Sequence, residues 1–366
     1  MSRTNSALTP PVSLPNHVTR VYGGVVLERL RQLPPGGKMA DLPPELQHES
    51  FVRIGPKKTG GPNLRLLRLE MDQPALTVTA YIYNKFVHPT EDRYITPREA
   101  ACLQDFPVQY EFCGPLAHVH QQIGNAVPVR LAKAIAQEVT RYFQRLGQCG
   151  LISIYSYFTG AGGLDLGFEL ASTEEITFQT VLATDIDASC RETVERNRPD
   201  WNFFLCDLRN VSPDEACRRA GNRAPDVIIG GPPCQPFSVA GKQKATSDPL
   251  GTLYRDFIHQ IDVLRPSIVV MENVYGLAQV KSANMIQEIQ DSFHKIGYQV
   301  QCRELNAADY GTPQKRRRLF FIASQRLDLF QFPAPTHAPG ANLLGLPSYS
   351  GAGASFAHLP QPLLKP

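Results

Sequence analysis

The sequence lacks long hydrophobic runs, paired cysteines and a secretory signal. No apolar stretch approaches the roughly 20 residues that a membrane-spanning helix needs. The N-terminal MSRTNSALTPPVSLPNH has no apolar segment of the kind that secretory signals carry. The eight cysteines are scattered, with no CxxC pair and no Cys/His cluster at zinc spacing, so reduced thiols are favoured over disulfides or a metal site. These absences predict a cytoplasmic protein without a metal centre.

A strong net charge is also missing. The 366 residues carry a formal net charge of +3, which permits an anionic partner without requiring one. Hydrophobic residues make up 42% and charged residues 19% of the chain, a balance typical of a globular protein with a buried core. The length suffices for one large domain and a smaller one.

The middle of the chain alternates between strand-like and helix-like segments. Runs rich in Val, Ile and Phe predict strands at 151–158, 180–186, 202–208, 226–231, 267–273, 298–305 and 318–324. Helices are predicted between most of them, at 164–171, 188–198, 254–264 and 282–297. This alternation predicts an α/β fold with a mostly parallel sheet covered on both faces, in which ligands bind beyond the carboxyl ends of the strands.

The two ends of the chain differ from the middle in composition. Residues 1–70 and 331–366 are rich in proline and glycine, and they are predicted to be irregular. Before the first strand, Thr96 followed three residues later by Glu99 is a capping-box pattern, which predicts the start of a short helix. A longer helix is predicted from about Val127 to Leu146.

A glycine-rich loop, FTGAGG at 158–163, follows the first of these strands. Glycines let a backbone approach a ligand closely, and the N-terminus of the following helix favours negative charge. The next two strands end in Asp185 and Asp207, which can accept ribose hydroxyls and an adenine amine. Each feature alone also fits a tight turn or a cap. Together they favour an adenosine-containing cofactor, either a dinucleotide or S-adenosylmethionine.

The strand predicted at 226–231 leads into GGPPCQPFS. Pro232, Pro233 and Pro236 allow neither a strand nor a helix to continue there. The loop is therefore predicted to hold Cys234 rigidly at the carboxyl end of the strand. A cysteine after a buried strand is commonly only a small hydrophobe, but a thiolate beside a cofactor is a nucleophile.

Acidic and basic side chains are predicted at the same edge of the sheet. Glu272 ends the next apolar run, where a partly dry pocket raises the pKa of a carboxyl, and Asn273 is placed to orient it. In QKRRR, strand alternation puts Arg316 and Arg318 on one face and Arg317 on the other. Basic runs are commonly solvated, but the apolar LFFIA that follows predicts that at least one arginine points into the site.

These groups together define a narrow chemistry. C5 of cytosine is a poor nucleophile, and addition of a thiolate at C6 turns the ring into an enamine whose C5 attacks an electrophilic methyl group. A carboxyl at N3 and an arginine at O2 stabilise the charge that develops. A base then removes the C5 proton, and the thiol is eliminated.

The motifs resemble those of the cytosine-C5 DNA methyltransferases, over roughly residues 65–340. FTGAGG, GGPPCQPFS, ENV and QKRRR resemble that family's cofactor loop, nucleophile loop, glutamate strand and QxRxR motif, while ITPREAACLQDFP and QQIGNAVP resemble its two closing motifs. In the usual order the closing motifs come last, whereas here they precede the cofactor loop. The chain is thus predicted to be circularly permuted, with the former ends joined through RYFQRLGQCGLIS.

The resemblance implies a Rossmann-like S-adenosylmethionine-dependent methyltransferase fold and a role for each motif residue. Cys234 is the implied nucleophile, and Glu272 contacts N3 and the amino group. Arg318 contacts O2, with Arg316 supporting it. The residues implied to surround S-adenosylmethionine are Phe158, Gly160, Ala161, Gly162, Asp185, Ile186, Asp207, Pro233, Leu253, Asn125 and Val127. Because a base inside a duplex is unreachable, the implied substrate is a cytosine flipped out of double-stranded DNA.

The resemblance also implies a domain division and a setting. A small domain covers 1–116, with target recognition at about 12–80; a catalytic domain covers 117–330; and a linker or tail at 331–366 packs with the small domain. The implied protein is a monomeric bacterial enzyme, cytoplasmic and bound to the nucleoid through DNA, with a restriction endonuclease as a genetic partner.

Other functions stay open at this point. A tRNA cytosine methyltransferase of the same fold would share all of the chemistry, although the GGP segment before LRLLRL favours the DNA enzymes. A dinucleotide-dependent oxidoreductase would explain the glycine loop but not Cys234, Glu272 and the arginine strand together. A catalytically inactive DNA-binding relative would not need these residues.

Overall fold

The computed structural model describes residues 14–48, 66–80, 85–233, 253–274, 283–343 and 345–365. Cys234, the predicted nucleophile, lies outside these ranges. Within them, no helix combines the length and the apolar character that crossing a bilayer takes.

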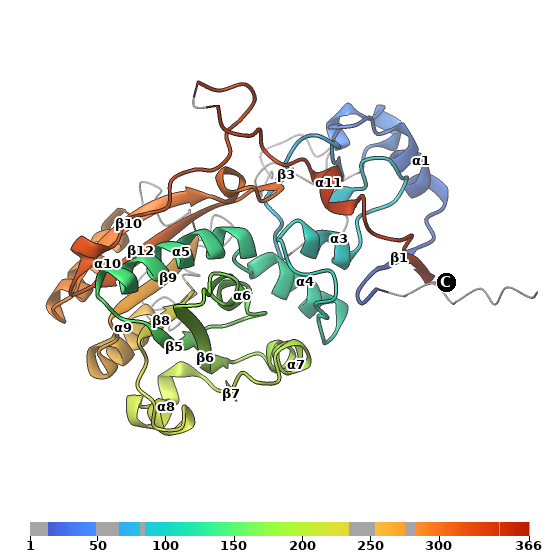
Figure 1. Cartoon of the computed structure of the whole chain (residues 1–366). Helices are drawn as coiled ribbons and strands as arrows, with labels where there is room; N and C mark the ends of the chain where they lie inside the picture. The colour runs from blue at the N-terminus through green and yellow to red at the C-terminus, as the bar shows by residue number, and fades with distance from the viewer. Residues whose placement is uncertain are drawn as a thin grey trace, which may run out of the picture.

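A seven-stranded sheet forms the centre of the molecule (Figure 1). Its strands lie in the order β10, β12, β9, β8, β5, β6, β7. β12 runs antiparallel to both of its neighbours, and the other pairs are parallel. The strands are β5 (Gly150–Tyr157), β6 (Ile176–Asp185), β7 (Phe203–Leu205), β8 (Val227–Gly230), β9 (Ile268–Val274), β10 (Gln299–Asn306) and β12 (Arg317–Ser324). Each coincides with a predicted strand, and the mostly parallel α/β fold is confirmed.

The burial of each strand follows from its place in the sheet. The central strands β8 and β9 are buried along nearly their whole length, because helices cover both of their faces. The edge strand β10 instead alternates between exposed and buried residues. Continuous apolar sequence therefore marks the middle of the sheet, where the predicted site lies.

Helices cover both faces of this sheet (Figure 1). They are α5 (Val129–Arg145), α6 (Gly163–Glu169), α7 (Ala188–Asn197), α8 (Pro213–Arg219), α9 (Leu253–Leu264) and α10 (Ala283–Lys295). α5 and α6 share one hydrophobic core with the sheet, and α8, α9 and α10 share the other. All except α8 were predicted, and α8 starts from a Ser-Pro cap in which Ser212 accepts a hydrogen bond from the backbone of Glu215.

α5 and α6 pack closely because Gly167 leaves room between them. An ideal Cβ at Gly167 would lie 2.3 Å from the Cβ of Ala132 and 2.6 Å from its carbonyl carbon. In an ordinary helix Ala is favoured over Gly by up to about 1 kcal/mol, but here the added methyl group must push two helices apart. We expect Gly167→Ala to lower the free energy of unfolding by about 1–3 kcal/mol, measured as a lower melting temperature. An unchanged or higher melting temperature would contradict this packing.

The N-terminal part of the chain is more regular than predicted. α1 (Gly24–Gln32) buries Leu30 and packs Val26 against the same small core. The buried members of this core are Leu30, Leu33, Met39, Leu42, Leu66 and Val87. Residues 1–70 were predicted to be irregular, and this prediction was wrong for α1. The apolar residues Val26 and Leu30 are four positions apart, as in a helix, but the proline and glycine residues around them concealed this pattern.

Short parallel strand pairs also form outside the central sheet. They are β1 (Val18–Arg20) with β13 (Leu363–Lys365), β2 (Leu67–Arg68) with β4 (Phe86–Val87), and β3 (Ala75–Leu76) with β11 (Gln314–Lys315). A short helix, α11 (Ala352–Phe356), precedes β13. The segment 331–366, predicted to be irregular, thus contains a helix and a strand, and its strand β13 lies beside β1 (Figure 1).

Two further helices lead from the small core toward the sheet. α3 (Pro97–Cys102) begins at the predicted cap: Thr96 Oγ1 accepts from the backbone N of Glu99 at 3.2 Å, and Glu99 Oε2 accepts from the backbone N of Thr96 at 2.7 Å. α4 (Leu116–Asn125) was not predicted, and it ends within the GNAVP sequence.

Candidate active site

The glycine loop and the cysteine loop start from neighbouring strands, β5 and β8. The order of the sheet reverses here, since β6 lies on one side of β5 and β8 lies on the other. In doubly wound sheets, ligands bind at the carboxyl ends of the strands at such a reversal. The predicted cofactor loop and nucleophile loop therefore leave the sheet side by side.

The glycine loop has an unusual backbone that Asp185 stabilises. Phe158, Gly160 and Gly162 have φ of 57°, 56° and 75°. Glycine adopts this left-handed conformation freely, whereas for phenylalanine it costs roughly 1–2 kcal/mol, and such strain is concentrated at functional sites. At the end of β6, Asp185 Oδ2 accepts from the backbone N of Gly160 at 2.8 Å, and Oδ1 accepts from that of Asp187 at 3.0 Å.

The surroundings of this loop fit an adenosyl group. An ideal Cβ on Gly160 would meet no atom within 4 Å, so the space above it is open. Beside it, Ile186 is an apolar side chain that is 69% exposed. Burial raises the pKa of Asp185, and its two oxygens offer about four acceptor sites. Asp185 can therefore accept a further hydrogen bond from a ribose hydroxyl. Ile186 offers an apolar surface for the adenine base of the same ligand.

Asp207 is less available than Asp185. Its carboxylate accepts from Nε of Arg209 at 3.0 and 3.1 Å, and these hydrogen bonds lower the pKa of Asp207. An adenine amine at this place would have to share the carboxylate with Arg209. The remaining predicted cofactor residues are Val127 and Leu253, which are buried, Pro233, which is half-buried, and Asn125, which is exposed.

The closing segments reach the glycine loop although they precede it in the sequence. The hydroxyl of Tyr110 donates to the carbonyl of Ala161 at 2.8 Å. The carbonyl oxygen of Val127 lies 2.5 Å from the place that a Cβ on Gly163 would take, and the ring of Trp201 lies against the loop as well. Sequence reasoning missed Tyr110 and Trp201, because single aromatic residues in loops carry no spacing signal.

Glu272 and Arg318 form a buried ion pair at the carboxyl end of β9. Arg318 Nε lies 2.9 Å from Glu272 Oε1, and 13% and 11% of the two side chains are exposed. Burial outweighs the nearby guanidinium groups, so the pKa of Glu272 is raised. A carboxyl with a raised pKa takes up a proton more readily, and it can then donate a hydrogen bond to a ring nitrogen.

Asn273 anchors the start of the cysteine loop. Its Nδ2 donates to the carbonyl of Pro232 at 3.2 Å, a contact that was not predicted. Gly231 lets the loop pass close to the carboxyl group, since an ideal Cβ there would lie 3.1 Å from Glu272 Oε2. The chain thus brings Glu272 beside the loop that leads, three residues later, to Cys234.

Arg316 binds backbone carbonyls at the junction of three segments. It is fully buried, and its guanidinium donates to Val78 O at 2.7 Å, Gly124 O at 2.9 Å and Asn125 O at 3.3 Å. The side chain of Arg317 is 54% exposed, so the predicted alternation of the three arginines is confirmed. Arg316 holds the segment after β3 and the end of α4 against the arginine strand.

Lys85 is a buried cation that sequence reasoning missed. Its Nζ donates to the carbonyl of Thr77 at 2.7 Å. Burial and the positive charge of Arg316 lower its pKa to about 8. Lys85 thus lies at the same junction between the small core and the arginine strand.

Comparisons with known proteins match most of this region. The model of the C-5 cytosine-specific DNA methylases matches residues 49–141 and 152–341. The Type II methyltransferase M1.HphI of Haemophilus parahaemolyticus is 36% identical over 215 residues, which are 58% of this chain and 54% of that protein. The Type II methyltransferase M.AquIA of Picosynechococcus sp. is 36% identical over 197 residues, 51% of this chain and 77% of that protein. Among solved structures, the methyltransferase EhMeth of Entamoeba histolytica is 20% identical over 55% of this chain and 58% of that chain, with a TM-score of 0.39.

The family match covers the motifs that the site is built from. This chain spans about half the length of several of the curated relatives that it matches, 54% for M1.HphI and 51% for M.FnuDI of Fusobacterium nucleatum. The two ranges matched by the family model make up more than half of the chain, and they contain the glycine loop, Glu272 and the arginine strand. The chain therefore belongs to the C-5 cytosine-specific DNA methylase family.

Proposed function

We propose that this protein transfers a methyl group to C5 of a cytosine in double-stranded DNA, as the methylase of a bacterial restriction–modification system. The observation that carries this proposal is the buried pair of Glu272 and Arg318, beside the start of the cysteine loop and at the reversal of strand order. A protonated carboxyl and a guanidinium group are complementary to N3 and O2 of cytosine. Family membership and the Type II relatives support DNA as the substrate.

The proposed cofactor is S-adenosylmethionine, which supplies an electrophilic methyl group when it is bound. The open space above Gly160 and the exposed side chain of Ile186 support this choice, as does the buried carboxylate of Asp185. The proposed cofactor-binding residues are Phe158, Gly160, Ala161, Gly162, Asp185, Ile186, Asp207, Pro233, Leu253, Asn125 and Val127.

In the proposed reaction, Cys234 is the nucleophile. Its thiolate forms a bond to C6 of the cytosine. The electron pair displaced to C5 would form the bond to the methyl group as the bond between that methyl group and the sulfonium sulfur of the cofactor breaks and leaves a thioether. Glu272 holds N3 and Arg318 holds O2, which stabilises the charge that develops on the ring. Loss of the C5 proton to a base then restores the double bond between C5 and C6 and expels the thiolate. Arg316 has a supporting role in this proposal, because it holds the carbonyls of Val78 and Gly124 against the strand that carries Arg318.

We also propose that the chain is a circular permutation of the usual family order, with a small domain at 1–116, a catalytic domain at 117–330 and a tail at 331–366. The contacts of Tyr110 and Val127 with the glycine loop support this, because they bring the closing segments to the cofactor site. Opening and rejoining a chain at surface loops leaves the order of strands in a sheet unchanged.

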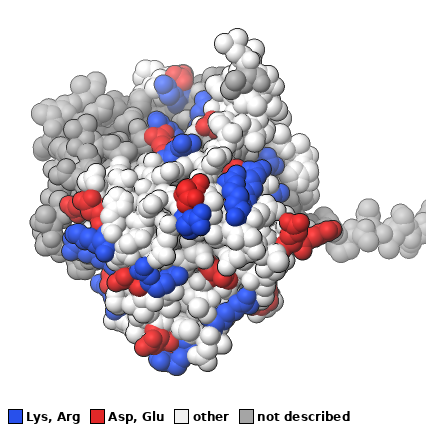
Figure 2. Space-filling model, turned by 60° about the vertical axis from the view of Figure 1, so that its left-hand side comes forward, with Lys and Arg blue, Asp and Glu red and all other residues white. Residues whose placement is uncertain are grey.

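The proposed DNA-binding region is the edge of the sheet that carries Glu272, together with the small core around α1. The enzyme must take the target base out of the stack to reach it. On the face that Figure 2 shows, the described lysine and arginine side chains stand among aspartate and glutamate side chains. Among its described residues, that face therefore has no continuous basic patch of the kind that attracts a phosphate backbone.

Duplex DNA that contains 5-fluorocytosine is expected to form a covalent adduct with the protein when S-adenosylmethionine is present. The reason is that fluorine cannot leave C5 as a proton does, so the bond between sulfur and C6 persists. The adduct is measured as a slower band on a denaturing gel, with the same duplex lacking fluorine as the control. A preparation that methylates ordinary DNA but forms no adduct would contradict thiol addition. Bisulfite sequencing of methylated DNA then identifies the modified base and its sequence context.

A further inference from the structure

The C-terminal segment 351–365 lies against the N-terminal segment of the chain. β13 pairs in parallel with β1, and the backbone N of Leu363 donates to the carbonyl of His17 at 3.0 Å. At the other end of the segment, the backbone N of Gly353 donates to the carbonyl of Met71 at 3.0 Å. The segment therefore contacts residues 17–20 near one end and Met71 near the other.

The middle of the C-terminal segment is part of a hydrophobic core. Phe356 is buried, and its ring stacks on that of His88 with centroids 5.5 Å apart and an interplanar angle of 27°. Ala352 and Phe356 belong to the same core as Ala100 and Ala101 of α3. The segment thus packs on α3 and on the ring of His88.

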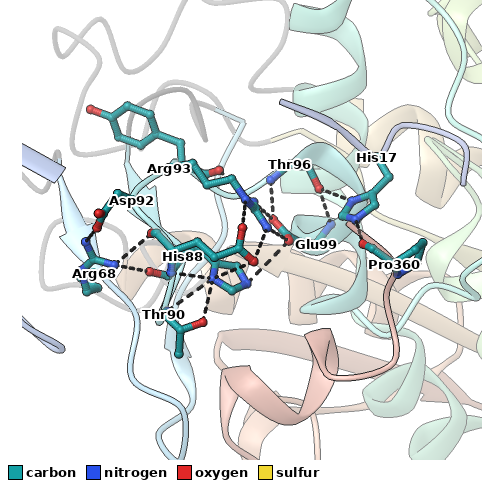
Figure 3. Close-up of polar contacts among 11 residues, drawn as sticks. His17, Arg68, His88, Thr90, Asp92, Arg93, Thr96, Glu99 and Pro360 are labelled. Carbon is teal, nitrogen blue, oxygen red and sulfur yellow. Dashed lines mark hydrogen bonds and ion pairs between the residues drawn. The ribbon is translucent and has the colours of Figure 1, made fainter. Parts of the chain in front are cut away.

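His17 links this segment to the start of α3 (Figure 3). It is only 2% exposed, with Nε2 2.7 Å from the carbonyl of Pro360 and Nδ1 2.9 Å from Oγ1 of Thr96. Since a carbonyl only accepts, Nε2 carries a proton and donates to Pro360, while Nδ1 lies within hydrogen-bond distance of the Thr96 hydroxyl. Thr96 also accepts from the backbone N of Glu99. One chain of hydrogen bonds therefore runs from α3 through His17 to the C-terminal segment.

Glu99 connects the start of α3 to residues beside the small core (Figure 3). Arg93 donates to both of its carboxylate oxygens, at 2.8 and 2.7 Å, and Nε2 of His88 lies 3.8 Å away. Arg68 of β2 donates to the carbonyl of His88 at 2.9 Å and to Asp92 at the same distance. The N-terminal end of α3 thus receives contacts from the small core and from the C-terminal segment.

The N-terminal segment is in turn bound to the part of the chain that contacts the glycine loop. Asn16 exchanges two hydrogen bonds with the backbone of Phe112, at 2.9 and 2.8 Å. The backbone N of Arg98 donates to the carbonyl of Asn16 at 3.1 Å. Two residues before Phe112, Tyr110 donates to Ala161 of the glycine loop. His17 therefore lies between the C-terminal segment and residues that reach the cofactor site.

The strand pair β1–β13 contributes little to this attachment by itself. Each strand has three residues, and Leu363 and Leu364 are 46% and 68% exposed. Isolated two-stranded ribbons are at best marginally stable in water. The attachment consequently depends on the contacts of His17, on the buried side chains of Ala352 and Phe356, and on the backbone hydrogen bonds of Ala352 and Gly353.

We infer that His17 is a positioning residue that fastens the C-terminal segment to α3, so that the DNA-recognition unit is built from both ends of the chain. The DNA part of this inference rests on the proposed function. Loss of the His17 contacts leaves the glycine loop and Glu272 in place but loosens the C-terminal segment on α3. The protein then binds DNA more weakly, whereas DNA that is bound is methylated at the rate of the parent protein.

The test cuts the folded chain without removing any part of it. A protease site is inserted at Leu343, whose side chain is fully exposed at 106%, and the purified protein is cleaved. We expect the cleaved fragment to stay bound during gel filtration when His17 is present and to separate in His17→Ala. In the uncut chain, His17→Ala is expected to raise the KM for DNA roughly tenfold, because two buried hydrogen bonds are lost. The kcat and the affinity for S-adenosylmethionine are expected to stay within about twofold, as those groups are untouched.

His358→Ala is the matched control, because His358 is an exposed histidine on the same segment. It should retain the fragment and the KM of the parent protein. His17→Gln, whose amide both donates and accepts, should restore part of the retention if His17→Ala folds poorly. Retention of the fragment by His17→Ala, or equal losses of DNA and cofactor affinity, would overturn the inference. Failure of the parent protein to methylate DNA would instead refute the proposed function, while fragment retention would still decide the role of His17.

Discussion

Cys234→Ser is expected to abolish methylation, with a loss of more than about 10⁴-fold, because a serine hydroxyl is not ionised at neutral pH and adds to C6 far more slowly than a thiolate. The start of the loop is held by Asn273 and by Pro232, and neither is altered by the substitution. Binding of DNA and of S-adenosylmethionine should therefore persist. Transfer of a labelled methyl group to DNA measures the loss, and a gel-shift assay measures the binding.

Cys149→Ser provides the control for this prediction, because Cys149 is exposed and lies near the start of β5, away from the carboxyl edge of the sheet. It should leave the rate unchanged. Methylation by Cys234→Ser at the rate of the parent protein would remove Cys234 from the mechanism. Loss of DNA binding together with activity would assign the residue a structural role.

Glu272→Gln is expected to lower kcat by about 10²–10⁴-fold while the affinity for S-adenosylmethionine changes little. An amide has the shape of the carboxyl and can donate a hydrogen bond, but it cannot pass a proton to N3. The substitution also leaves Arg318 buried without its carboxylate, which lowers stability. A single-turnover assay at saturating DNA and cofactor isolates the chemical step.

The control is Glu304→Gln, which removes a carboxylate that pairs with the exposed Arg317 on the neighbouring strand. This variant should keep the parent rate, since the pair lies outside the buried site. Equal losses of rate and cofactor affinity in Glu272→Gln would indicate that Glu272 only supports the fold.

The pH profile gives a second readout of Glu272. Its protonated form is the one that donates to N3, and burial raises its pKa. The rate of the parent protein should therefore be highest below the raised pKa and fall as the pH rises through it. Glu272→Gln has no proton to lose there, so this descending limb should be absent from its profile. An identical limb in both proteins would assign the titration to another group.

Much of the central fold could be predicted because its signals are local. The runs of Val, Ile and Phe are continuous in β8 and β9, since both faces of these strands are covered by helices. The capping box of Thr96 and Glu99 depends on residues three apart, and it places the start of α3. The alternation of Arg316 and Arg318 with Arg317 follows from the period of two in any strand.

The contacts of the site were harder to predict, because backbone groups are their partners. Arg316 donates to the carbonyls of Val78 and Gly124, and any residue type supplies a carbonyl. The same holds for Asn273 and Pro232. Tyr110 and Trp201 contact the glycine loop from distant segments of the chain, so no residue spacing in the sequence predicts these contacts.

The sequence by itself determined the seven strands, the α3 cap and the set of residue types that points to cytosine chemistry. Only the tertiary structure decided that Glu272 is paired with Arg318, that Lys85 is buried, and that β13 pairs with β1. His17 and Pro360 are 343 positions apart, and no local pattern in the sequence specifies the hydrogen bond between them. The spacing of apolar residues along the sequence specifies a strand or a helix. The hydrogen-bond partner of a buried polar group depends instead on which distant segment packs against it.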